Sequence, residues 1–110
     1  MSALFSPKKL RGLELSNRIM VAPMCQYSAV DGEANDWHFT HINTLALSGA
    51  AMFCIEATAV EAIGRITPSC LGLWNDATEA ALKPILASVI SPTAMVVTPM
   101  ACLMACANGT

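Results

Sequence analysis

Ile19-Met20-Val21-Ala22 is a run of four apolar residues that ends at Pro23. A short, wholly apolar run stopped by proline is typical of a strand buried on both faces, as in a parallel sheet. Met52-Phe53-Cys54-Ile55 repeats this pattern further along the chain. The two runs therefore predict two neighbouring strands of one sheet.

The segment between these runs has a helical pattern from Asn35 or Asp36, either of which can cap it, to about Leu47. Gly49 is then expected to end the helix as a C-terminal cap. The order strand, helix, strand predicts a βαβ unit in an α/β fold. The apolar face expected to pack on the sheet comprises Trp37, Phe39, Ile42, Leu45 and Ala46.

Three further elements flank this unit. Lys9 to Leu15 alternates around Gly12, which can supply the positive φ of a hairpin turn. Asp76-Ala77-Thr78-Glu79 has the form of a capping box that opens a second helix, which we expect to kink or restart at Pro84. Residues 94–97 form a candidate third strand, and residues 64–74 are expected to form a loop.

The composition restricts the class of protein. Of the 110 residues, 55% are hydrophobic and 13% are charged, which excludes a disordered chain. The length allows one domain and is too short for a complete large barrel. A net charge of −2 without a basic cluster argues against nucleic-acid binding. Five widely spaced cysteines and the lack of a secretory signal favour free thiols in the cytoplasm.

The charged residues stop at Lys83, and residues 84–110 carry none. A membrane-spanning segment is one explanation, although three prolines interrupt it. A third strand with a disordered or helical end is another. We favour a third explanation, in which sequence from another reading frame follows a truncated gene.

Polar and reactive side chains follow both predicted strands, in residues 23–28 and 56–60. In parallel α/β folds ligands bind beyond the carboxyl ends of the strands, so these segments predict a small-molecule site. Cys25 could equally be a small buried residue and Tyr27 a rim aromatic.

Five other side chains have structural interpretations. A metal pair of His38 and His41 lacks further ligands in the sequence, so structural histidines are favoured. We expect Glu56 to be structural and Arg65 to anchor a loop. Trp74, like Trp37, is expected to anchor the core.

A series of short motifs follows one order and spacing along residues 4–90: Leu4-Phe5-Ser6-Pro7, Leu10-Arg11-Gly12-Leu13, Asn17-Arg18-Ile19, residues 22–28, Asn35-Asp36-Trp37-His38, residues 56–60, residues 64–68, residues 71–76 and residues 81–85. In this order and spacing, the motifs resemble the start of an Old Yellow Enzyme homologue, in the NADH:flavin oxidoreductase / NADH oxidase family. The cysteine that follows Pro23-Met24 resembles the pattern of the YqjM-like subgroup.

The resemblance implies the amino-terminal portion of a (β/α)8 TIM barrel, with a hairpin closing its bottom and two to three βα units. It implies an FMN-dependent NAD(P)H oxidoreductase, an ene-reductase acting on C=C bonds of unsaturated carbonyl compounds, with a small-molecule substrate and homo-oligomers. By the same resemblance, Tyr27 would reach the substrate and Cys25 would adjust the flavin potential. The implied cofactor-binding residues are Ala22, Pro23, Met24, Cys25 and Ala57; no metal is implied.

The sequence departs from the family pattern after about residue 90. The expected third-strand Gln and the His-Ala-Gly-Arg stretch are absent from it. We therefore divide the chain into residues 1–90, part of a flavin barrel, and residues 91–110, a divergent uncharged tail. The chain alone is expected to be inactive, and the alternative is a non-catalytic remnant or interaction module that has lost flavin binding.

Overall fold

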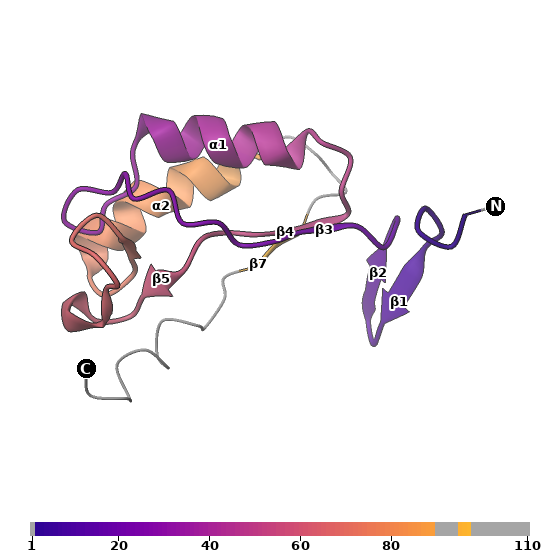
Figure 1. Cartoon of the computed structure of the whole chain (residues 1–110), viewed down its shortest axis with the longest axis horizontal. Helices are drawn as coiled ribbons and strands as arrows, with labels where there is room; N and C mark the ends of the chain where they lie inside the picture. The colour runs from indigo at the N-terminus through magenta and orange to yellow at the C-terminus, as the bar shows by residue number, and fades with distance from the viewer. Residues whose placement is uncertain (1, 90–94, 98–110) are drawn as a thin grey trace.

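The computed structural model describes residues 2–89 and 95–97 of the chain. Its central element is a parallel sheet of β3 (Met20–Val21), β4 (Met52–Cys54) and β7 (Met95–Val97), in that order. Helix α1 (Asp36–Ala46) connects β3 to β4, and α2 (Asp76–Ala87) precedes β7. Both helices lie on the same side of the sheet (Figure 1). The βαβ prediction and the third strand are therefore confirmed.

The hydrophobic core lies between this sheet and the two helices. Phe53 and Ile55 of the β4 segment are almost fully buried against Ile42 of α1 and Leu82 of α2. Because strand side chains alternate, Met52 and Cys54 must face the opposite side of the sheet. The parallel register pairs Met20 with Met52, so Met20 shares that face.

The expectation that the first strand is buried on both faces is wrong. Met20 is 57% exposed, whereas Val21 packs partly buried against the core. The cause is the position of both helices on one face of the sheet. Within residues 2–89 and 95–97, the three strands form an open sheet that does not close into a barrel.

Helix α1 begins as predicted but buries a different face. The Asn35 side chain accepts a hydrogen bond from Trp37 N, and His38 at the third helical position completes a capping box. The helix buries His38, Ile42 and Ala46, while Trp37 and Phe39 are about half exposed. Trp37 is therefore not the core anchor that apolar spacing predicted, because an apolar type alone does not select the buried face.

The structure differs from the sequence prediction at three helix positions: one cap of each helix is a different residue, and α2 has no restart at Pro84. Asn75, not Asp76, caps α2, since its side chain accepts from Thr78 N at 2.9 Å. The α2 helix runs on through Pro84 without restarting. Leu47 is the C-cap of α1, and Gly49 lies two residues beyond with φ +92°.

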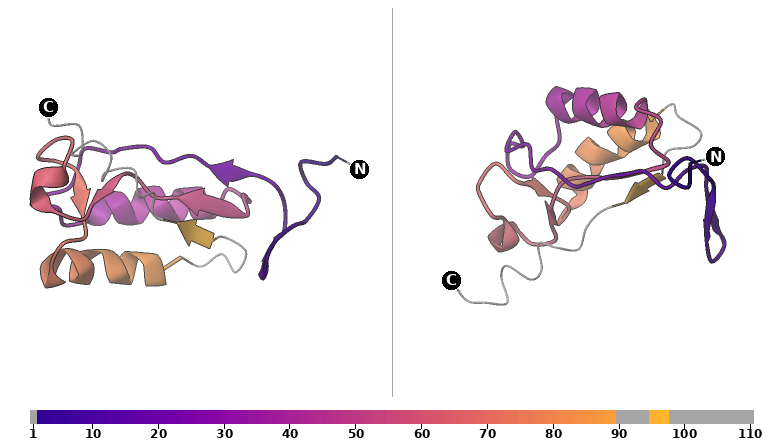
Figure 2. Two further views of the ribbon diagram at one scale, coloured as in Figure 1. Left: turned by 90° about the horizontal axis from the view of Figure 1, so that it is seen from below. Right: turned by 45° about the vertical axis from the view of Figure 1, so that its right-hand side comes forward.

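An antiparallel hairpin of β1 (Lys8–Leu10) and β2 (Leu13–Leu15) precedes the sheet. Arg11, not the predicted Gly12, takes the positive φ, at +52°. The reason is that the first central position of this two-residue turn requires it, and glycine stands at the second. Figure 2 shows the hairpin projecting at one end of the molecule, away from the helices.

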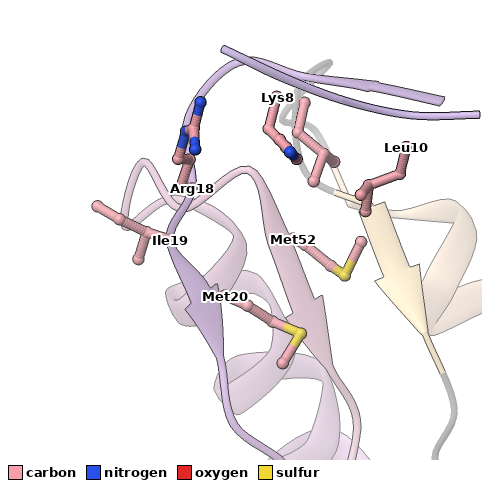
Figure 3. A pocket seen from close by; sticks show the side chains of 7 residues that line it. Lys8, Leu10, Arg18, Ile19, Met20 and Met52 are labelled. Carbon is pink, nitrogen blue, oxygen red and sulfur yellow. The ribbon is translucent and has the colours of Figure 1, made fainter. Parts of the chain in front are cut away.

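The hairpin lies at the amino ends of β3 and β4, as the resemblance implied. Together they line an open pocket of about 320 Å³ (Figure 3). Asn17 connects the same strand ends: its Nδ2 donates to Gly49 O at 2.8 Å, and its Oδ1 accepts from Ile19 N and Ala51 N. The pocket is lined by Lys8, Leu10, Leu15, Arg18, Ile19, Met20 and Met52.

A second, smaller parallel pairing joins β5 (Thr58–Ala59) to β6 (Leu71–Gly72), around the 3-10 helix η1 (Ala62–Gly64). This pairing falls partly in the region expected to be a loop. Two-residue strands carry no periodic signal, so the sequence could not indicate them. Among the helices that the structure describes, none has the length and hydropathy needed to span a bilayer. The rest of the predicted uncharged tail, residues 91–94 and 98–110, lies outside the described residues.

Candidate functional site

The loop of residues 22–28 leaves β3 at the carboxyl end of the sheet. Ala22, Pro23 and Met24 are exposed there, and Cys25 is half-buried. Tyr27 is 55% exposed. In parallel α/β folds this edge is where ligands bind, so the structure brings these predicted site residues together at the expected place.

Two backbone N–H groups of this loop are available as hydrogen-bond donors. The N–H groups of Met24 and Cys25 make no hydrogen bond to the part of the chain that the structure describes. Pro23 has no N–H at all. A ligand that covered this stretch would bury both donors, so it would have to bring acceptor atoms for them.

Gln26 fixes the conformation of the loop through four hydrogen bonds. Its backbone N donates to Glu56 Oε2 at 3.3 Å, and its Nε2 donates to Met24 O at 2.9 Å. Its Oε1 accepts from Trp37 Nε1 at 3.0 Å, and its backbone O accepts from Ser28 Oγ at 2.9 Å. The loop is thus tied both to α1 and to the segment after β4.

Tyr27 follows Gln26 and has a φ of +53°. A bulky side chain rarely adopts this left-handed conformation, which costs about 1–2 kcal/mol. Such strain persists only where the surrounding structure enforces it, and it concentrates at functional sites. The hydrogen bonds of Gln26 and Ser28 on either side supply that enforcement.

Glu56 and Ala57 come from the neighbouring strand. Glu56 is only 6% exposed, and its carboxylate accepts the hydrogen bond from the backbone N of Gln26. Its backbone O accepts from Thr58 Oγ1 at 2.9 Å. Ala57 is half-buried beside it. The structural role expected of Glu56 is confirmed.

The two histidines of α1 have separate environments. His38 is 1% exposed, with Nε2 3.7 Å from Glu56 Oε1. His41 stacks on the exposed Trp37, with ring centroids 6.4 Å apart. Within the described ranges no group of three or more His, Cys, Asp or Glu could hold a metal ion. The interpretation of His41 as a structural histidine agrees with its contact. His38 differs from the expected satisfied or solvated histidine, because it is buried and its Nε2 has no hydrogen bond to the described residues.

Trp74 and Arg65 stabilise the loops around β5 and β6. The Trp74 ring packs so closely on Gly32 and Gly72 that a Cβ at either would overlap it. Arg65 lies over this ring at 5.3 Å, and its Nε donates to Ala62 O at 2.9 Å. Arg65 thus anchors a loop, as predicted. Trp74 is half-buried outside the hydrophobic core, so it is not the core anchor that was expected.

Sequence reasoning missed the central position of Gln26. It named the flanking Cys25 and Tyr27, yet Gln26 makes the contacts that hold both. The available signal was a polar residue in the loop after one strand, with Glu56 in the segment after the next strand. Spacing indicates such neighbours but not which of their atoms meet.

Comparison with known proteins gives a consistent result. The model of the NADH:flavin oxidoreductase / NADH oxidase family matches residues 3–106. The chain is 48% identical over 82 residues to NADH:flavin oxidoreductase FG08077 of Gibberella zeae, covering 74% of this chain and 20% of that protein. It is 48% identical over 88 residues to NADPH dehydrogenase of Listeria monocytogenes, covering 78% and 26%.

Solved structures agree on the fold. Morphinone reductase superposes with a TM-score of 0.77 at 26% identity, over 87% of this chain and 25% of that one. The old yellow enzyme homologue from Zymomonas mobilis superposes with a TM-score of 0.76 at 23% identity, over 88% and 27%, which bears on the fold alone. These proteins are TIM barrels, and the chain matches part of one.

The chain spans about a fifth to a quarter of the length of these relatives. The family match runs beyond residue 90, where the sequence pattern departs from expectation. The division of the chain at residue 90 stays a prediction.

Proposed function

The chain belongs to the NADH:flavin oxidoreductase / NADH oxidase family, the Old Yellow Enzymes, and from that premise we propose that it carries part of the site of an FMN-dependent NAD(P)H oxidoreductase. The reaction we propose is reduction of C=C bonds in unsaturated carbonyl compounds. The observation that carries the proposal is 48% identity over 88 residues to an NADPH dehydrogenase. NADPH and NADH are both compatible with it.

The residues at the carboxyl end of the sheet fit a flavin. The free N–H groups of Met24 and Cys25 suit the acceptor atoms of an isoalloxazine ring, and Ala22 and Pro23 are small and exposed beside them. Ala57 is small and lies in the segment after β4. We assign these five residues to FMN binding. FMN, when bound, supplies the hydride chemistry, and the protein supplies orientation and electrostatics.

Two side chains have roles beyond binding in this proposal. The Cys25 thiol is a polarizable weak donor, so placed near the ring it adjusts the reduction potential. Tyr27 is exposed at the same edge and can donate from its phenol O–H, so we assign it to orienting the substrate. The small-molecule substrate enters at the same edge of the sheet.

Binding to this chain alone is expected to be weak. Phosphate groups of barrel cofactors are held by loops after the last strands, and the sequence lacks the expected His-Ala-Gly-Arg stretch. We therefore expect flavin binding without turnover. Free thiols at Cys25, Cys54 and Cys70 support a cytoplasmic setting. Homo-oligomers and the lack of nucleic-acid and membrane partners stay predictions.

The test is a titration of the full chain with FMN, followed by flavin fluorescence and by the amide resonances of Met24 and Cys25. We expect saturable quenching, with shifts at those two amides. Ala57→Leu should weaken binding about tenfold because its larger side chain fills the ring space. Ala62→Leu, at an exposed position in η1, is the matched control and should bind normally.

No saturable change up to about 1 mM FMN would contradict the proposal. That result would instead favour the remnant or interaction module that has lost flavin. Equal affinity of Ala57→Leu and wild type would remove Ala57 from the binding site.

A further inference from the structure

Two buried polar side chains meet beneath the loop of residues 22–28. Glu56 is 6% exposed and His38 is 1% exposed, so neither presents its polar atoms to a ligand at the surface. They come from different elements, the segment after β4 and the first turn of α1. Buried charged and polar groups are costly unless they are paired, so this placement demands a reason.

The hydrogen bonds of His38 define its tautomer. Nδ1 accepts from the backbone N of Asn35 at 3.1 Å and lies 3.3 Å from Asn35 Oδ1. Because a backbone N–H can only donate, we assign the proton of a neutral ring to Nε2. Nε2 is buried without a hydrogen bond to any described atom, and it lies 3.7 Å from Glu56 Oε1. The ring N–H is therefore held close to the carboxylate.

Glu56 faces donors on both sides. Oε2 receives the backbone N–H of Gln26 at 3.3 Å, and Oε1 lies near the His38 N–H. Within the described residues, no Lys or Arg forms an ion pair with this carboxylate. A carboxylate places an oxygen toward both groups, whereas an amide in its place would set an NH₂ group against one of the two donors.

We propose that Glu56, oriented by His38, is a positioning residue that sets the conformation of the loop carrying Met24, Cys25 and Tyr27. The consequence for flavin rests on the proposed function; the positioning itself does not. Gln26 transmits the effect, because Glu56 holds its backbone while Trp37 holds its side chain. We call these four residues, Gln26, Trp37, His38 and Glu56, the Gln26 clamp.

The clamp accounts for the unusual backbone that follows it. Tyr27 keeps φ at +53° only while the residue before it is fixed. Met24 is fixed from the same residue, through Gln26 Nε2 to its carbonyl. Loss of the Glu56 contact therefore frees both ends of the segment that contains Cys25.

The experiment follows the backbone amide of Gln26 by NMR in the full chain without FMN. In Glu56→Gln we expect its proton resonance to move upfield and its hydrogen exchange to become about tenfold faster, because a charged acceptor is lost. His38→Gln should move the same resonance in the same direction, by less. Glu61→Gln, at an exposed glutamate, is the matched control and should leave it in place.

A second variant covers a failure of the buried substitutions to fold. Trp37→Phe removes the indole donor to Gln26 at a half-exposed position, so folding should be unaffected. It should speed exchange of the Gln26 side-chain and backbone amides while circular dichroism stays unchanged. An unchanged Gln26 amide in folded Glu56→Gln, or in Trp37→Phe, would overturn the clamp. An unchanged Gln26 amide resonance in His38→Gln would show that His38 does not orient Glu56.

FMN affinity separates this inference from the proposed function. If the chain binds FMN, Glu56→Gln and Trp37→Phe should each weaken it several-fold, and Glu61→Gln should not. Wild-type affinity for FMN in both clamp variants would show that the clamp does not position the loop for flavin binding. If no variant or wild-type chain binds FMN, the proposed function fails, and the Gln26 amide alone decides the clamp.

Discussion

The two ends of the parallel sheet are built from different chemistry. At the amino ends of β3 and β4, an apolar pocket lies under the hairpin, and one side chain, Asn17, joins the strands through backbone groups. At the carboxyl ends, buried Glu56 and His38 hold a loop with a strained tyrosine. The contacts at the amino end stabilise the fold, whereas those at the carboxyl end hold one loop conformation that includes the strained backbone of Tyr27. This is the usual division between the two ends in (β/α) folds.

The largest effect should come from the core that both ends share. Phe53 is 1% exposed between the sheet and the helices. Phe53→Ala should lower the free energy of unfolding by about 3–5 kcal/mol, measured by urea denaturation. Phe39→Ala, the matched change at an exposed phenylalanine of α1, should cost less than about 1 kcal/mol. Similar costs for the two variants would show that the core does not lie where the structure puts it.

Asn17→Ala tests the amino end. It removes a donor to Gly49 O and an acceptor for two backbone N–H groups at the strand starts. We expect a loss of about 2 kcal/mol in unfolding free energy, with FMN affinity of the folded fraction unchanged. A fall in FMN affinity at constant folded fraction would break the distinction between the two ends.

Gln26→Ala tests the carboxyl end and should show the reverse pattern. It removes the side-chain bonds to Trp37 and Met24 but leaves the core intact. We expect about 1 kcal/mol of lost stability and about tenfold weaker FMN binding, measured by denaturation and titration. A large loss of stability with normal FMN affinity would mean that the loop serves the fold and not the site.

The smallest effect concerns Cys54, on the sheet face opposite the helices. Burial raises the pKa of its thiol above the ordinary value of 9.0. The unfolded chain then ionises first, so the stability from Cys54 is full below about pH 9 and is lost as pH rises through the folded pKa. When the pH is raised from about 7 to about 10, the unfolding free energy of Cys54→Ala should therefore fall less than that of wild type. Denaturant midpoints at each pH measure this. Parallel losses in the two proteins would show that this face is as open to water as the unfolded chain.

The sequence determined the order of the hairpin, the three strands of the central sheet and the two helices. Apolar runs before Pro23 and after Gly49, with a capped helical segment between them, allow little besides a βαβ unit. The family was also readable, since its motifs are local strings of residues in a set order. The positions of Cys25, Tyr27 and Ala57 at strand ends followed from the same local patterns.

The tertiary structure alone decided which faces are buried and which atoms meet. Trp37 and His38 are neighbours on one helix, yet packing buries the histidine and leaves the indole half exposed. The Gln26 clamp joins three segments that are distant in sequence, and its geometry depends on how α1 packs over β4. Periodicity and motifs report local preference, whereas such contacts arise only when separate elements come together in space.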